Sequence, residues 1–212
     1  MAGTSDVLAG IKALPGVSYP VLVPNEKGLA TLLNLLETSP SLTNEIAIFV
    51  AASESFSKAN INCSIAESLN RLYPVVEAAR NKGIRVRGYI STVIVCPYEG
   101  PVAPSTVRDI SKALIDMGCY EVSLGDTTGR GTPASMTSML ESVLSVIPPE
   151  KLANHDTFGL GVANALTALE AGIRTIDSSV AGLGGCPYSP GATGNVATEP
   201  LGHRLHPAWH RI

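Results

Sequence analysis

Short, continuously apolar runs alternate with amphipathic segments along most of the chain. Runs of this kind, bounded by turn residues, are typical of strands buried on both faces, as in a parallel sheet. A shorter run at 151–156 predicts one further strand. The five clear strands are predicted at residues 19–24, 45–52, 84–91, 121–125 and 174–180.

Helical patterns separate these runs. Ser64 and Glu67 form a capping-box pattern at the start of one helix, and Gly83 follows its end. Strict alternation of strand and helix predicts parallel βαβ units, hence an α/β fold that is either a TIM barrel or a doubly wound sheet. The helices are predicted at 5–14, 28–36, 64–82, 103–117, 133–146 and 160–170.

Length and composition predict one globular domain. The chain has 212 residues, 45% of them hydrophobic, which is enough for a sizeable core. The net charge is −3, with no basic block to neutralise phosphates and no apolar run of membrane-spanning length, so neither nucleic acid nor a membrane is an expected partner. Four widely spaced cysteines without a C-x-x-C pair fit a reducing compartment, and we expect a cytoplasmic protein.

Polar side chains collect where the predicted strands end. Tyr89 lies within the third strand, Asp126 follows the fourth, and His155 lies near the end of the short 151–156 run. In a TIM barrel the carboxyl ends of the strands carry the chemistry. A doubly wound sheet gathers polar groups in the same way, so this pattern does not choose between the two folds.

The stretch 178–199 holds five glycines and two prolines around Cys186. Glycine at this density occurs where the backbone turns sharply or approaches a ligand closely. A surface loop with an incidental thiol explains the composition equally well.

The segment 179–188, Ser-Val-Ala-Gly-Leu-Gly-Gly-Cys-Pro-Tyr, resembles the signature of the 3-hydroxy-3-methylglutaryl-CoA (HMG-CoA) lyase family. Matching segments at 60–63, 86–89, 96–100 and 123–127 extend the resemblance over residues 1–199. It implies an incomplete TIM (β/α)8 barrel that lacks the family's first two strands. Residues 200–212 match nothing in the family and are expected to form a divergent, disordered tail.

The resemblance also implies a reaction and a set of residues. Lyases of this family cleave HMG-CoA to acetyl-CoA and acetoacetate with a divalent cation, Mg²⁺ or Mn²⁺. By matching position, Cys186 is the thiol of a mobile loop, and Asp126 orders or helps to deprotonate the substrate. Tyr89 and Ser123 would line the acyl-CoA pocket. The metal ligands would be His155 and Asn195. Core packing, turn formation and helix capping are the alternative roles for these side chains.

Three departures from the family pattern limit the expected activity. The catalytic Arg-Asp pair of the family's first strand has no counterpart, and Ala153 replaces the first histidine of a metal-binding His-x-His-Asp. The third is the divergent tail. Losing several such groups lowers the expected rate steeply, because each 1.36 kcal/mol is about tenfold.

Two alternatives therefore stay open beside the lyase. One is a non-catalytic subunit that binds acyl-CoA or pairs with an intact lyase; the other is an aldolase or Claisen-type lyase for another acyl-CoA. Open barrel edges predict a homo-oligomer or pairing with another chain. A targeting segment ahead of Met1 would place the protein in mitochondria or peroxisomes.

Overall fold

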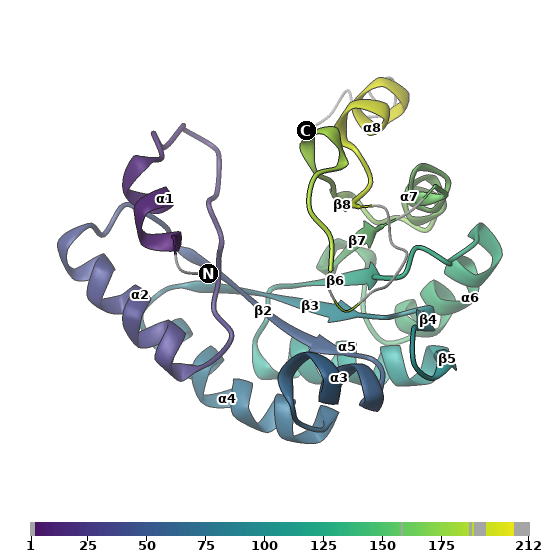
Figure 1. Ribbon diagram of the computed structural model, residues 1–212, viewed down its shortest axis with the longest axis horizontal. Helices are drawn as coiled ribbons and strands as arrows, with labels where there is room; N and C mark the ends of the chain where they lie inside the picture. The colour runs from purple at the N-terminus through teal and green to yellow at the C-terminus, as the bar shows by residue number, and fades with distance from the viewer. Residues whose placement is uncertain (1–2, 158, 187, 189–193, 206–212) are drawn as a thin grey trace.

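The computed structural model describes residues 3–157, 159–186, 188 and 194–205. Its centre is a six-stranded, all-parallel sheet (Figure 1). A two-stranded antiparallel hairpin, β4 (Val95–Cys96) and β5 (Gly100–Pro101), follows the third strand. The order across the sheet is β1 (Val21–Leu22), β2 (Glu45–Ala51), β3 (Arg85–Ser91), β6 (Glu121–Asp126), β7 (Leu152–Asp156) and β8 (Thr175–Asp177).

The strand order never reverses: each parallel strand is added beside the one before it. A doubly wound sheet reverses at its switch point, whereas a barrel keeps adding strands in one direction. The α/β prediction is therefore confirmed, and the winding is that of a TIM barrel. The sheet formed by the described residues is not closed, because β1 and β8, the strands at its two edges, do not pair with each other.

Helices cover one face of the sheet (Figure 1). They pack against alternate strand residues such as Ile48, Val86 and Leu124, which are fully or almost fully buried. Within the described chain, no helix is long and apolar enough to cross a bilayer. The helices are α1 (Thr4–Gly10), α2 (Glu26–Thr38), α3 (Glu54–Ile61), α4 (Ile65–Asn81), α5 (Pro104–Met117), α6 (Pro133–Leu144), α7 (Gly161–Glu170) and α8 (Thr198–Leu205), with 3-10 turns η1 (Pro149–Lys151) and η2 (Val180–Gly182).

The structure differs from the sequence-based elements in three places. The first strand is only two residues long, since Pro20 and Pro24 flank it and donate no backbone hydrogen bond. Helix α3 lies in a stretch for which no element was predicted. Helix α8 crosses the predicted boundary at residue 199, while residues 206–212 lie outside the described part; the two-part division stays a prediction.

The opposite, concave face of the sheet is polar. Because side chains alternate along a strand, the residues between the core positions point to this face. Helices α1 and α8 stand at opposite ends of the sheet on this side (Figure 1).

The capping box at the start of α4 is present as predicted, and it yields a stability test. Ser64 Oγ accepts from the Glu67 backbone N–H, and the Glu67 carboxylate accepts from the Ser64 N–H. Replacing Ser64 by Ala should lower the free energy of unfolding by about 1 kcal/mol in urea denaturation. Ser138→Ala, at an exposed position inside α6, is the control and should be near neutral. Equal losses in both variants would contradict a capping role.

Candidate active site

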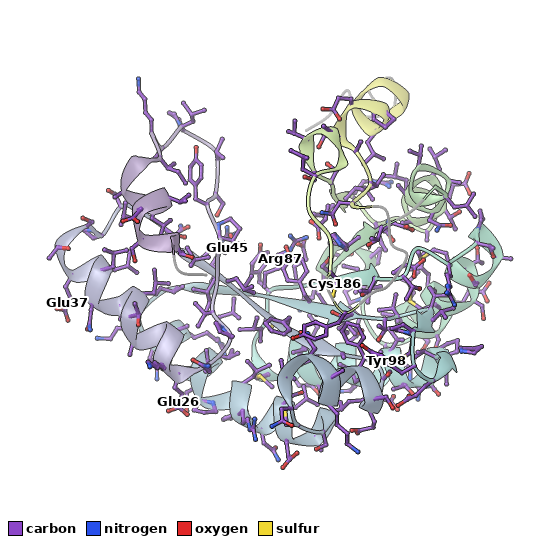
Figure 2. The ribbon with its side chains drawn as sticks, in the orientation of Figure 1. Glu26, Glu37, Glu45, Arg87, Tyr98 and Cys186 are labelled. Atoms are coloured by element: carbon purple, nitrogen blue, oxygen red, sulfur yellow. The ribbon has the colours of Figure 1, made fainter. Side chains whose placement is uncertain are left out.

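A buried ion-pair network crosses the concave face, with Arg87 of β3 at its centre (Figure 2). The Arg87 Nε donates to Glu121 Oε1 of β6 at 2.6 Å, and Nη2 lies 2.9 Å from Asp177 Oδ1 of β8. Thr175 Oγ1 donates to the second Glu121 oxygen at 2.9 Å. Three strands are thereby connected through one guanidinium, whose planar fork suits several carboxylate contacts at once.

Tyr89 and Ser123, the predicted substrate residues, both contact this network. Arg87 Nη1 donates to the Tyr89 hydroxyl at 2.6 Å, and the guanidinium carbon lies 4.9 Å from the ring centroid. Burial, followed by the charge of Asp177, raises the pKa of Tyr89 to about 12, so the phenol is neutral at physiological pH. Ser123 Oγ donates to Asp177 Oδ2 at 2.6 Å, but Ser123 is 0% exposed. Tyr89 therefore reaches the concave surface, whereas Ser123 is covered.

His155 of β7 faces the same side as Ala153, two residues earlier. Its Nδ1 is buried and has no hydrogen-bond partner among the described residues. Burial lowers the pKa of His155 although the charge of Asp177 acts in the opposite direction, so the imidazole is neutral near pH 7. A neutral imidazole with a free nitrogen can bind a cation or accept a proton.

Asp126 lies at the carboxyl end of β6, but its carboxylate holds the loop that follows the strand. Asp126 is 0% exposed, and its Oδ2 accepts from the Gly131 N–H at 2.6 Å. Thr128 donates to Oδ1 at 3.3 Å. Burial raises the pKa of Asp126 although these donors oppose the rise. In this structure the side chain holds the β6–α6 loop, and its role toward a substrate stays a prediction.

Cys186 lies in the glycine-rich loop that follows β8. This loop reaches back to the carboxyl end of β2, where Cys186 packs on a small cluster of Ala51, Phe56 and Cys96. The hydroxyl of Tyr98, in the turn of the β4–β5 hairpin, donates to the Tyr188 carbonyl at 3.4 Å and gives the loop a second contact. Cys186 is partly exposed and lies on the concave side in Figure 2.

Asn195 lies on the returning arm of the same loop. Its side-chain Nδ2 donates to the Leu183 carbonyl at 2.9 Å, and its backbone N–H donates to the Gly182 carbonyl. Gly194 has a φ of +124°, and a Cβ there would lie 2.5 Å from the Gly182 carbonyl oxygen, so only glycine fits. Cys186, Asn195 and His155 thus share the carboxyl edge of the sheet, but no contact joins them within the described residues.

The described donors do not complete a metal centre. No group of three or more His, Cys, Asp or Glu side chains converges in the described part of the chain. The predicted ligands His155 and Asn195 bring no carboxylate, which Mg²⁺ and Mn²⁺ favour, and Ala153 offers no donor atom. Among the described residues, His155 Nδ1 has no hydrogen-bond partner and could bind a cation.

Arg87, Asp177 and Glu121 were missed at the sequence level. The signal was present, since β3 reads Arg-Val-Arg-Gly-Tyr-Ile-Ser, with polar or aromatic residues at every second position. That alternation marks one polar face on this strand.

This arrangement defines a class: a parallel β/α barrel protein with a polar interior face and a glycine-rich, cysteine-bearing loop over the carboxyl ends of its strands. Comparison with known proteins identifies it further. The HMGL-like family model matches residues 26–209, and the chain belongs to this family.

The related proteins include the cytoplasmic 3-hydroxy-3-methylglutaryl-CoA lyase of Rattus norvegicus, 56% identical over 208 residues. That match covers 97% of this chain and 59% of the relative, so the chain spans about three-fifths of its length.

Two crystal structures confirm the barrel-type fold. An HMG-CoA lyase from Brucella melitensis matches at a TM-score of 0.90 and 48% identity, covering 98% of this chain and 72% of that one. An HMG-CoA lyase from Acinetobacter baumannii, in complex with coenzyme A and 3-methylmalate, matches at 0.88 and 32%, covering 97% and 66%.

One buried polar residue beside the site yields a stability test. Asn154 of β7 points to the helix-covered face, in register with Leu124 and Ile176, and neither its Oδ1 nor its Nδ2 has a hydrogen-bond partner in the described part of the chain. A buried unpaired amide costs about 1–3 kcal/mol. Asn154→Val should therefore raise the free energy of unfolding by about that amount.

Asn164 provides the matched control, because its Nδ2 donates to the Gly131 carbonyl at 3.0 Å and to Asp156 Oδ2 at 2.7 Å. Asn164→Val should lower the free energy of unfolding. Loss of stability in Asn154→Val would mean that the amide does find partners.

Proposed function

We propose that this chain is a lyase-type barrel unit that acts on HMG-CoA, cleaving a carbon–carbon bond to give acetyl-CoA and acetoacetate. The observation that carries the proposal is the path of the cysteine loop. Rooted beyond β8, it passes over the carboxyl ends of the strands and places Cys186 against β2. A loop in that position covers the part of a barrel where ligands bind.

The residues of the concave face can bind and orient an acyl-CoA thioester. Tyr89 supplies a neutral hydroxyl, and His155 supplies an unpaired ring nitrogen. Cys186, partly exposed on a glycine-flanked loop, is placed to exchange a proton with a bound acyl group once the loop closes. Asp126, whose carboxylate holds the neighbouring loop, is the proposed residue that orders or helps to deprotonate the substrate.

A divalent cation is part of this proposal, with Mg²⁺ or Mn²⁺ as the candidates. His155 and Asn195 are the proposed ligands from this chain, and further donors must come from elsewhere because the described residues do not complete the set. Relatives include proteins named cytoplasmic and mitochondrial, and we expect one of these two compartments.

A second function is favoured by one observation. Ala153 occupies the inward position two residues before His155, so β7 offers a single imidazole where two would chelate a cation. The alternative is a non-catalytic subunit that binds acyl-CoA or associates with a complete lyase.

The experiment is a direct assay of the purified chain with HMG-CoA and added Mg²⁺ or Mn²⁺. Acetoacetate should form only when the cation is present. Cys186→Ala should lower the rate by about 100-fold, as expected for loss of a proton-transfer group. Cys63→Ala, which removes a buried thiol outside the proposed site, should not change the rate per folded molecule.

No acetoacetate above the blank from a folded sample would reject the lyase proposal for this chain. Calorimetric binding of HMG-CoA in that same sample would then support the non-catalytic subunit.

A further inference from the structure

We propose that Arg87 is a positioning residue that makes Tyr89 a hydrogen-bond donor to the bound acyl group. The inference deepens the proposed function and rests on it. It assigns the partner of the Tyr89 proton to a carbonyl or carboxylate oxygen of the ligand.

The first step concerns what each atom can do. A guanidinium has five N–H donors and no acceptor, so the contact of 2.6 Å between Arg87 Nη1 and the Tyr89 oxygen has Arg87 as its donor. The phenol oxygen is thereby engaged as an acceptor. Its own proton has no acceptor among the described residues and remains available to a ligand.

The second step concerns why Arg87 cannot turn away. Its Nε donates a hydrogen bond to Glu121, and its Nη2 forms an ion pair with Asp177, on two different strands. Asp177 in turn accepts from Ser123, and Glu121 accepts from Thr175. Arg87 is only 8% exposed, so releasing the fork would leave buried charges unpaired.

The third step concerns the direction of the hydroxyl. Tyr89 lies two residues nearer than Arg87 to the carboxyl end of β3, where the cysteine loop lies. Tyr89 is partly exposed, in contrast to the covered Ser123. The proton of Tyr89 therefore faces the space between the sheet and that loop.

A second arginine–tyrosine pair, Arg85 with Tyr120, provides the control. Arg85 lies two residues before Arg87, pairs with Glu45 and stacks over Tyr120, with 4.7 Å between its guanidinium carbon and the ring centroid. Tyr120, however, donates its proton to Glu45 Oε1 at 2.6 Å. Tyr89 thus accepts a hydrogen bond from an arginine, whereas Tyr120 donates one to a carboxylate.

The test that needs no ligand is NMR of protein labelled with ¹³C at the tyrosine Cζ. The chain has six tyrosines, and Tyr89→Phe assigns one resonance by its loss. Arg87→Met should shift the Tyr89 resonance more than that of Tyr120, which is near the Arg87 charge but accepts no hydrogen bond from it, whereas Arg85→Met should do the reverse. Arg87→Lys keeps the positive charge but lacks the planar guanidinium, and it should shift the Tyr89 resonance in the same direction. This variant replaces Arg87→Met if the latter fails to fold.

The second readout is binding, measured by calorimetry with HMG-CoA and with free CoA. Arg87→Met and Tyr89→Phe should each weaken HMG-CoA binding by about tenfold, the scale of one lost hydrogen bond, and leave CoA binding unchanged. The double variant should be no weaker than either single variant. This non-additivity is the signature of one residue acting through the other.

An unmoved Tyr89 resonance in the Arg87 variants, or additive losses in the double variant, would overturn the inference. If the unaltered chain binds HMG-CoA no better than CoA, the proposed function fails instead. The NMR result still decides whether Arg87 sets the polarity of Tyr89.

Discussion

A single guanidinium determines how the concave face of this sheet is built. Arg87 is buried, and a buried charge is tolerated only when it is paired and hydrogen-bonded. Its partners Glu121 and Asp177 lie on β6 and β8, so the pairing is satisfied only when three strands adopt one relative register. A slip of one residue in any of them would turn a charged side chain into the apolar layer under the helices.

The two faces of the sheet consequently differ in what holds them together. Under the helices, close-packed Ile, Val, Leu and Met side chains supply stability by burial. On the concave face, ion pairs and hydroxyls supply order, and the free energy that they add is small once desolvation is counted. A polar interior of this kind can accept a polar ligand without exposing an apolar surface to water.

Much of the fold could be predicted from sequence because its signals are local. The apolar run of β2 and the capping box of α4 involve residues close together in the chain, and both are present in the structure. Helix α3 was not predicted, since its eight residues have almost no apolar stripe. Strand β1 is short because prolines on both sides remove ladder donors, an effect the apolar run concealed.

The site was harder to predict because its geometry depends on contacts between distant segments. Asp126 lies at the end of a strand, as predicted. Because side chains alternate along β6, Asp126 points to the same face as Val122 and Leu124, and its carboxylate contacts the β6–α6 loop. The pairing of Arg87 with Asp177 joins residues 90 positions apart and exists only once β6 and β7 lie between them. No local pattern carries that information.

The small side chain of Ala153 limits what β7 can contribute to coordination. It is fully buried on the inward side of β7, between the strands that Arg87 and Asp177 connect. A methyl group carries no lone pair, so β7 can attach an ion through one ring nitrogen, without the chelate ring that a second imidazole would close.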